Sequence, residues 1–349
     1  MKLEMKPIEI FFGTGGVGKT TLATSRALYL ASEGHKVLLI TIDPSLRLKQ
    51  LLGISDDARG EATKVDLNQF EKSGELYSLL LTPSHTLARA LKENEEDEAE
   101  IENNSILSSL STQHGGLNEI MAVVELQYQI SKKQFDCIIV DTPPGKHFVD
   151  FLNATSKIKD FFDKNFEEIF QYLGKKTGST LSTPKKFITR IVSSGVKKLL
   201  GYLEKVTGAD FVHLFIDTVL VLYRNKENFL NSLKFQETIK DPNIANLFLV
   251  TAVDHNKVLE AQSLRTTVQK LSSENQVLLL NRSNRKGIES WQPTDNGELA
   301  QIKDVLLSKE TTITEQASKS FSKVKVFEEF ISFSLSEQLK ELSTQWEQE

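Results

Sequence analysis

The chain has few sulfur-containing residues for its length. Of its 349 residues, one is a cysteine, Cys137, and three are methionines. A single cysteine cannot form an intrachain disulfide, a zinc site of paired cysteines, or the cysteine set that holds an iron–sulfur cluster. We therefore expect no structural disulfide, no zinc and no role as an iron–sulfur electron carrier.

The chain also lacks the segments that direct a protein to a membrane or out of the cell. Its N-terminal residues contain no apolar run followed by a small-residue cleavage site. The most apolar stretch, residues 211–223, is too short to span a bilayer. The net charge of −5 gives no general attraction to nucleic acid or anionic membranes. A cytoplasmic location is expected, without stable membrane insertion or nucleic-acid binding.

Apolar runs alternate with helical patterns in two parts of the chain. Residues 8–12 are an apolar run, residues 22–33 have helical spacing, and residues 37–42 are a second apolar run. A similar strand, helix and strand order returns between residues 247 and 280. This order predicts an α/β fold with a mostly parallel sheet flanked by helices, because parallel strands are buried on both faces. Residues 1–349 are interpreted as a single domain.

A region of different character, residues 151–242, separates these two parts. Its apolar residues recur mostly at three- and four-residue steps, as in Ile158, Phe161, Phe162, Phe166, Ile169, Phe170 and Leu173. We predict an inserted helical subdomain, with a strongly basic stretch at residues 171–206. Its apolar faces either open a groove for a protein partner or an apolar helix, or pack on each other.

The clearest motif is a phosphate-binding loop. Residues 13–20 read G-T-G-G-V-G-K-T, which fits G-x-x-x-x-G-K-[ST], and they follow a predicted strand and precede a predicted helix. A glycine-rich turn arising by chance would not combine this match with this context. The motif predicts ATP and Mg²⁺ as cofactors, with Lys19 reaching the β- and γ-phosphates and Thr20 ligating the metal. The candidate nucleotide-binding residues here are Gly13, Thr14, Gly15, Gly16, Val17, Gly18, Lys19, Thr20 and Thr21.

Three segments together resemble the ArsA-type ATPase family. They are GTGGVGKTT, TIDPSLRLKQLLG and IIVDTPPGKHFVDFL, and the resemblance runs from residue 8 to about residue 285. That family includes the arsenite-pump ATPase and the targeting factor for tail-anchored membrane proteins. The resemblance implies a P-loop NTPase with a helical subdomain inserted after the second switch. It also implies a nucleotide-switched dimer, either a homodimer or a pair with a related ATPase.

Two aspartates take catalytic and metal-binding roles by this resemblance. Asp43, which follows the second strand, matches the switch I residue that orients or deprotonates the attacking water, although an Asp before Pro44 can also cap a turn. Asp141 ends the strand CIIVD and matches the carboxylate that holds a magnesium-bound water; the alternative is a solvated residue at a strand end. The candidate metal ligands are thus Thr20, Asp43 and Asp141.

The second residue of the loop departs from the family pattern. Members with the deviant loop carry a lysine there that reaches the partner subunit's phosphates, whereas this chain has Thr14. Arg47 and Lys146 are basic residues within the two switch segments. We hypothesise that one of them neutralises transition-state charge, and the alternative is a solvent-facing base on a loop.

The resemblance also suggests a base pocket. Asn281 follows the strand at residues 277–280 and matches the family's asparagine that reads adenine. Asp254 lies where the family places an acidic residue near the base, and helix N-capping is its alternative role. ATP is expected over GTP, since no NKxD-like motif stands in this region.

ATP hydrolysis could serve three purposes. The favoured hypothesis is binding and release of a protein partner. The second is an energising subunit of an anion transporter, although one cysteine cannot build a thiolate site for arsenite. The third is a partitioning or positioning ATPase that acts on DNA or membrane. The C-terminal stripe Leu335, Leu339, Leu342 and Trp346 has an acidic polar face, so we predict a packed terminal helix and not a membrane-surface helix.

Overall fold

The computed structural model divides the chain into two units. It describes residues 3–42, 49, 52–53, 60–91, 118–161, 205–206, 208, 218, 222, 225–269, 276–293, 297–330, 332 and 334–347. Unit 1 consists of Met1–Thr82, Tyr128–Leu152 and Phe235–Glu349, and unit 2 consists of Pro83–Gln127 and Asn153–Lys234. Each unit is considered by itself.

Unit 1 is built on one eight-stranded sheet with the order β3-β4-β2-β5-β1-β6-β7-β8. All neighbouring strands are parallel except β3, which runs antiparallel to β4. The predicted α/β fold with a mostly parallel sheet is confirmed, while β8 was not foreseen. The strands are β1 Ile8–Gly13, β2 Lys36–Thr41, β3 Thr63–Lys64, β4 Glu75–Leu80, β5 Cys137–Asp141, β6 Ala245–Ala252, β7 Gln276–Ser283 and β8 Val324–Glu328.

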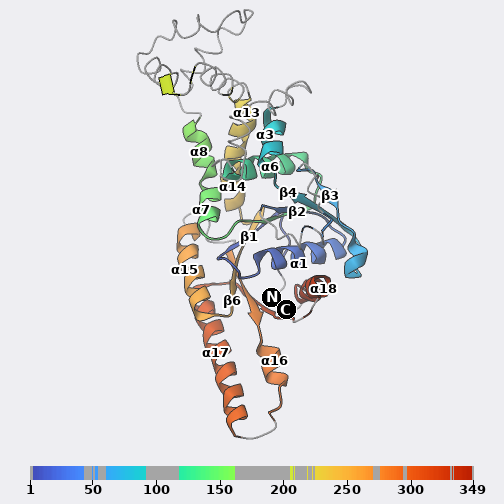
Figure 1. Cartoon of the computed structure of the whole chain (residues 1–349), viewed down its shortest axis with the longest axis vertical. Coiled ribbons are helices and arrows are strands. Elements are labelled where there is room, and N and C mark those ends of the chain that lie inside the picture. Colours follow the sequence, from blue (N-terminus) through green and yellow to red (C-terminus); the bar gives the residue numbers. More distant parts are fainter. Residues whose placement is uncertain are drawn as a thin grey trace, which may run out of the picture. The chain divides into compact units, whose positions relative to one another are not determined.

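One face of this sheet is covered by α1 (Lys19–Ser32) and α18 (Leu335–Gln345), which lie side by side in Figure 1. A short 3-10 helix, η1 (Leu67–Phe70), adds to the same core. Leu339, Leu342 and Trp346 are at most 3% exposed. The prediction of a packed terminal helix is confirmed, because its apolar stripe faces α1 and the sheet.

The other face of the sheet carries the helix that follows β5. Since successive strand residues point to opposite faces, Phe11 contacts Trp346 while Phe12 stacks on Phe148 of α7 (Lys146–Leu152), with ring centroids 4.4 Å apart. Phe151 of α7 then meets Phe235, the first residue of α14 (Phe235–Lys240). The described residues of unit 1 also include the end of α6 (Asn118–Lys132), α15 (His255–Gln269), α16 (Arg285–Ser290) and α17 (Glu298–Ser320).

A buried ion pair joins α1 to β1 beneath α18. Arg26 donates to both carboxylate oxygens of Glu9 at 2.8 Å, and both side chains are fully buried. The Trp346 ring lies 5.0 Å from the guanidinium carbon, and its indole N–H donates to Ser25. The phosphate-loop helix is thereby fixed to its strand and to the C-terminal helix.

Unit 2 is helical where it is described. It contains α3 (Pro83–Leu91), the first part of α6 (Asn118–Lys132), α8 (Ala154–Phe161), α13 (Lys226–Leu230) and η2 (Asn231–Lys234). These elements share a core that includes Leu87, Leu91, Met121, Ile158 and Phe229. The insert at 151–242 stays a prediction, since most of that range lies outside the described residues. No helix of the described part is long and apolar enough to cross a membrane.

Candidate functional site

The phosphate loop joins the end of β1 to the start of α1. Gly13 ends β1, Lys19 begins α1, and Gly18 is the residue before the helix, with φ +87°. Among the described residues, no side chain caps this helix start, and its first turn carries no acidic residue. The first helical N–H groups have no intrahelical acceptor, so this terminus suits an anion such as phosphate.

Two glycines of the loop are required by close approach. A Cβ atom on Gly13 would lie 2.2 Å from the Val250 carbonyl oxygen of the neighbouring strand. A Cβ on Gly18 would lie 2.2 Å from Nδ2 of Asn281, and its left-handed φ also disfavours other residues. Because these two glycines have no side chain, the loop can pack closely against β6 and β7.

Lys19 is folded into the loop that precedes it. Its ammonium group donates to the Thr14 carbonyl oxygen at 2.9 Å, and the residue is 8% exposed. Burial lowers the pKa of Lys19, and attraction to Asp141 acts in the opposite direction. The Lys19 side chain thus reaches across the loop, from the start of α1 to Thr14. At this position a phosphate oxygen could replace the Thr14 carbonyl oxygen as the acceptor of the lysine's hydrogen bond.

Asp141 stands at the carboxyl end of β5, where ligands of parallel sheets bind. It is 2% exposed and pairs in register with Phe11 on β1 and Thr41 on β2. Thr20 is the second residue of the adjacent helix α1. Hydroxyl and carboxylate oxygens are the ligands that Mg²⁺ prefers, so the donor chemistry of Thr20 and Asp141 fits that ion.

The loop after β5 is tied to the phosphate loop by backbone hydrogen bonds. Thr142 donates its N–H and its hydroxyl to the Phe11 carbonyl oxygen, at 3.2 and 2.8 Å. Gly145, with φ +56°, donates its N–H to the Gly13 carbonyl oxygen at 3.0 Å. The segment that leads into α7 is therefore fixed to β1, the strand that leads into the phosphate loop.

The predicted base residues lie at neighbouring strand ends. Asn281, 5% exposed, donates from Nδ2 to the Val17 carbonyl oxygen at 2.9 Å. Its own carbonyl accepts from Val253, and Ala252 on β6 is its register partner. Asp254 is exposed, and its carboxylate accepts from the Lys257 N–H at 3.1 Å, which is a capping bond at the start of α15.

The comparison with known families accounts for this arrangement. A profile of the anion-transporting ATPase family matches residues 6–331. The chain belongs to this family. Membership confirms the predicted ArsA-type resemblance.

Curated relatives are similar to this chain over part of its length. The "ATPase GET3" of Rhodotorula glutinis is 26% identical over 245 residues, which are 66% of each chain. The "ATPase get3" of Schizosaccharomyces pombe is 29% identical over 152 residues, 44% of each chain. The "ATPase ARSA2" of Chlamydomonas reinhardtii is 24% identical over 269 residues, 72% of this chain and 70% of the relative. The chain thus spans less than two thirds of the length of the first two.

Some predicted site residues are not placed by the structure. Asp43 and Arg47 lie outside the described residues, and the Lys146 side chain does as well, although its backbone begins α7. The chain leads toward Asp43 from a fixed point, because Ile42 donates its N–H to the Asp141 carbonyl oxygen at 3.3 Å. The roles of these three residues stay predictions.

The bonds of Thr142 and Gly145 were missed by the sequence interpretation. Their signal was available, since both stand in the segment DTPPG directly after the strand-end aspartate. A threonine beside a buried strand end and a glycine before a helix are both typical of backbone bonding.

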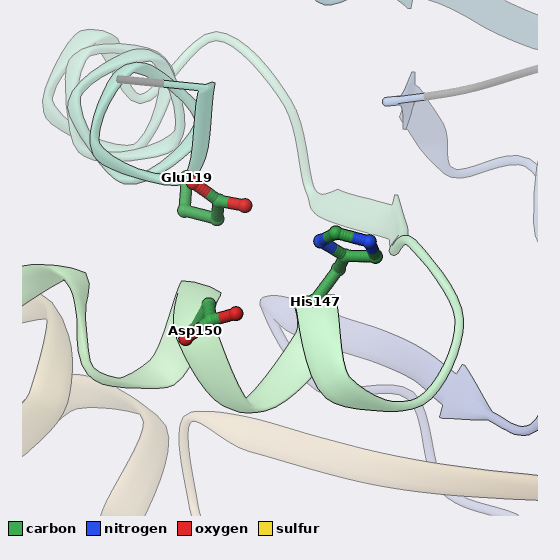
Figure 2. Close-up of side chains that lie close together, drawn as sticks. All are labelled: Glu119, His147 and Asp150. Atoms are coloured by element: carbon green, nitrogen blue, oxygen red, sulfur yellow. The ribbon is translucent and has the colours of Figure 1, made fainter. Parts of the chain in front are cut away.

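Figure 2 shows three side chains with metal-binding groups, Glu119, His147 and Asp150. His147 and Asp150 project from α7 in unit 1, whereas Glu119 comes from α6 in unit 2. Since they come from two separate units, we assign no metal site to them.

Proposed function

We propose that the chain is a Mg²⁺-dependent ATPase that works as a nucleotide-switched dimer and binds and releases a protein partner. The observation that supports this most directly is the hydrogen bond from Gly145 to Gly13, together with those from Thr142 to Phe11. These bonds join the loop that binds phosphate to the segment that begins α7. A change at the γ-phosphate can therefore reach the helix that leads out of the site.

In this proposal the chain's own residues bind and orient the nucleotide. Lys19 exchanges the Thr14 carbonyl for a phosphate oxygen, so its positive charge serves the ligand once it arrives. The N–H groups at the start of α1 hold the phosphates. Thr20 and Asp141 would hold Mg²⁺, which neutralises phosphate charge when bound. Asp43 would orient the attacking water, as predicted from its segment.

The same contacts support a route by which the nucleotide state changes α7. Phe12, next to the loop in β1, stacks on Phe148, whose ring lies 6.1 Å from that of Phe151. Packed aromatic side chains transmit small displacements because interiors are close-packed. Residue 153 alone separates α7 from α8, the helix at which the chain continues in unit 2.

We propose that unit 2, including the predicted insert, binds the protein partner. In the described residues its apolar side chains pack into a core of their own. This favours, for those residues, the interpretation that apolar faces pack on each other. The cytosolic location stays a prediction.

The dimer and the basic residue that neutralises transition-state charge are also proposals. Thr14 cannot supply a charge across a dimer interface. Arg47 or Lys146 would then act on the transition state, in the same subunit or its partner. Turnover of Arg47→Ala and Lys146→Ala, each compared with the unmodified protein, tests this assignment, and two unchanged rates would reject it.

Anion transport is a second candidate, supported by the description of the family. Capture of a metalloid by Cys137 is not part of it. Cys137 is fully buried, and burial raises the pKa of its thiol well above the ordinary value. A thiol in that environment is neither an accessible nor an ionised ligand.

The test is a pull-down in ATP with the unmodified protein, Asp43→Asn and Lys19→Ala. Asp43→Asn should hold the ATP form and enrich the partner, while Lys19→Ala should retain only background proteins. If all three preparations retain the same proteins, the nucleotide-switched partner function is wrong. Turnover that rises with an added anion, and not with a captured protein, would favour the second candidate.

A further inference from the structure

The side chain of Asn281 contacts the phosphate loop. The amide nitrogen donates to the Val17 carbonyl oxygen at 2.9 Å, across 264 residues of sequence, and Val17 is 1% exposed. A buried carbonyl that loses its partner is costly, because no water replaces the hydrogen bond. The bond therefore fixes one peptide group of the loop.

The fixed peptide group also contains the N–H of Gly18, one of the backbone donors of the loop. A trans peptide is planar, so its C=O and N–H point in opposite directions. When the Val17 carbonyl points toward Asn281, the N–H of Gly18 in the same peptide points away from Asn281. That is the side on which the loop and the start of α1 can surround a phosphate.

Packing supports the same relationship. The Asn281 amide occupies the space where a Cβ on Gly18 would lie, at 2.2 Å from Nδ2. Asn281 thus supports two consecutive residues of the loop, through a hydrogen bond at Val17 and by contact at Gly18.

The strand that carries Asn281 is held by neighbouring strands on both of its edges. Asn281 belongs to β7, which is paired on one side with β6 and on the other with β8. The Asn281 carbonyl accepts from the Val253 N–H at 3.0 Å. The next residue, Arg282, has φ +62°, and the pairing of β7 with β8 is irregular between Leu280 and Ser283 before it resumes at Ser283.

We propose that Asn281 is a positioning residue of the phosphate loop, which holds the Gly18 N–H toward the phosphates whatever base the nucleotide carries. This goes beyond a role in reading adenine, and it is compatible with one, since the amide keeps a second N–H. The inference rests on nucleotide binding by the loop and not on the proposed partner or dimer.

The test uses a ligand that has no base. Binding of Mg-ATP, Mg-GTP and Mg-tripolyphosphate is measured by calorimetry for the unmodified full chain, Asn281→Leu and Asn281→Ala. Asn281→Leu keeps a similar shape without a donor, and Asn281→Ala removes the donor without adding bulk beside Gly18. Gln276→Leu is the control, because Gln276 is 5% exposed and lies at the opposite end of the same strand.

An additional contact with adenine would enlarge only the loss for Mg-ATP. For the ligands without adenine, Mg-tripolyphosphate and Mg-GTP, both Asn281 variants should lose affinity by the same factor. We expect about tenfold, which corresponds to about 1.4 kcal/mol. Amide hydrogen exchange of residues 13–22 without nucleotide should become faster in both variants and remain unchanged in Gln276→Leu. A loss confined to Mg-ATP, with unchanged hydrogen exchange, would show that Asn281 acts only on the base and would overturn the inference.

Discussion

Gly145 donates its backbone N–H to the carbonyl oxygen of Gly13, and so links the start of α7 to the last residue of β1. Both ends of this bond lie in segments that the sequence assigns to nucleotide binding and switching. Neither side chain takes part, so the link depends only on backbone conformation. Its removal requires a residue that lacks an N–H.

Gly145→Pro should uncouple binding from turnover. Proline has no N–H and cannot adopt the φ of +56° seen at Gly145. We expect a kcat at least about tenfold lower with a Kd for Mg-ATP that changes less than about threefold. Gly145→Asn is the control, since it retains the N–H, asparagine tolerates a left-handed φ better than other residues with a side chain, and no atom lies within 4 Å of the added Cβ. A normal kcat in Gly145→Pro would contradict the role of this bond.

Lys19→Met should weaken Mg-ATP binding by about 10- to 100-fold, the size of a charge-assisted hydrogen bond. Calorimetry measures the affinity, and Lys257→Met, which removes an exposed ion pair on α15, is the control. Equal affinities for the two variants would mean that Lys19 does not contact the phosphates.

The pH dependence of stability should also change in Lys19→Met. Burial holds the pKa of Lys19 below the ordinary 10.5, so the unfolded chain binds the proton more tightly than the folded one. Stability from this group is therefore lower at neutral pH and rises as the pH passes through the folded pKa toward 10.5. We expect Lys19→Met to exceed the unmodified protein in free energy of unfolding at pH 7. Urea unfolding at pH 7 and 10 should show the difference shrinking; a constant difference would contradict it.

Asp141→Asn should remove the effect of magnesium on nucleotide binding. An amide in place of the carboxylate keeps the shape and loses the charge that would hold the ion's water. We expect the affinity gain on adding Mg²⁺ to fall by about 10- to 100-fold, whereas ATP binding in EDTA should change little. Titrations with and without EDTA measure both. An undiminished magnesium effect would place the ion elsewhere.

Breaking the Glu9–Arg26 pair should cost about 3–5 kcal/mol of unfolding free energy in either single variant, Glu9→Gln or Arg26→Met. Each leaves one buried charge without its partner, beneath Trp346. The double variant should lose less than the sum of the two. Arg285→Ala, which removes an exposed pair with Glu289, should cost less than about 0.5 kcal/mol in the same urea experiment. Additive losses would show that the pair is not coupled.

Local patterns were sufficient for the fold class and for the position of the phosphate loop. The loop motif stands between two recognisable apolar runs, and β1 and α1 enclose it as predicted. The position of Asp141 at the end of β5 and the terminal helix with Trp346 could also be predicted from the sequence. Strand ends and helical stripes can be predicted because they depend on residues that are close together in the chain.

Only the tertiary structure decided which residues far away in the sequence contact the phosphate loop. Asn281 reaches Val17 across most of the chain, and Gly18 has to be glycine partly because that amide lies against it. The partnership of Glu9 with Arg26 likewise depends on how α1 crosses the sheet. Sequence periodicity reports which face of an element is buried, whereas contacts between elements depend on strand order and register, which a single sequence does not encode locally.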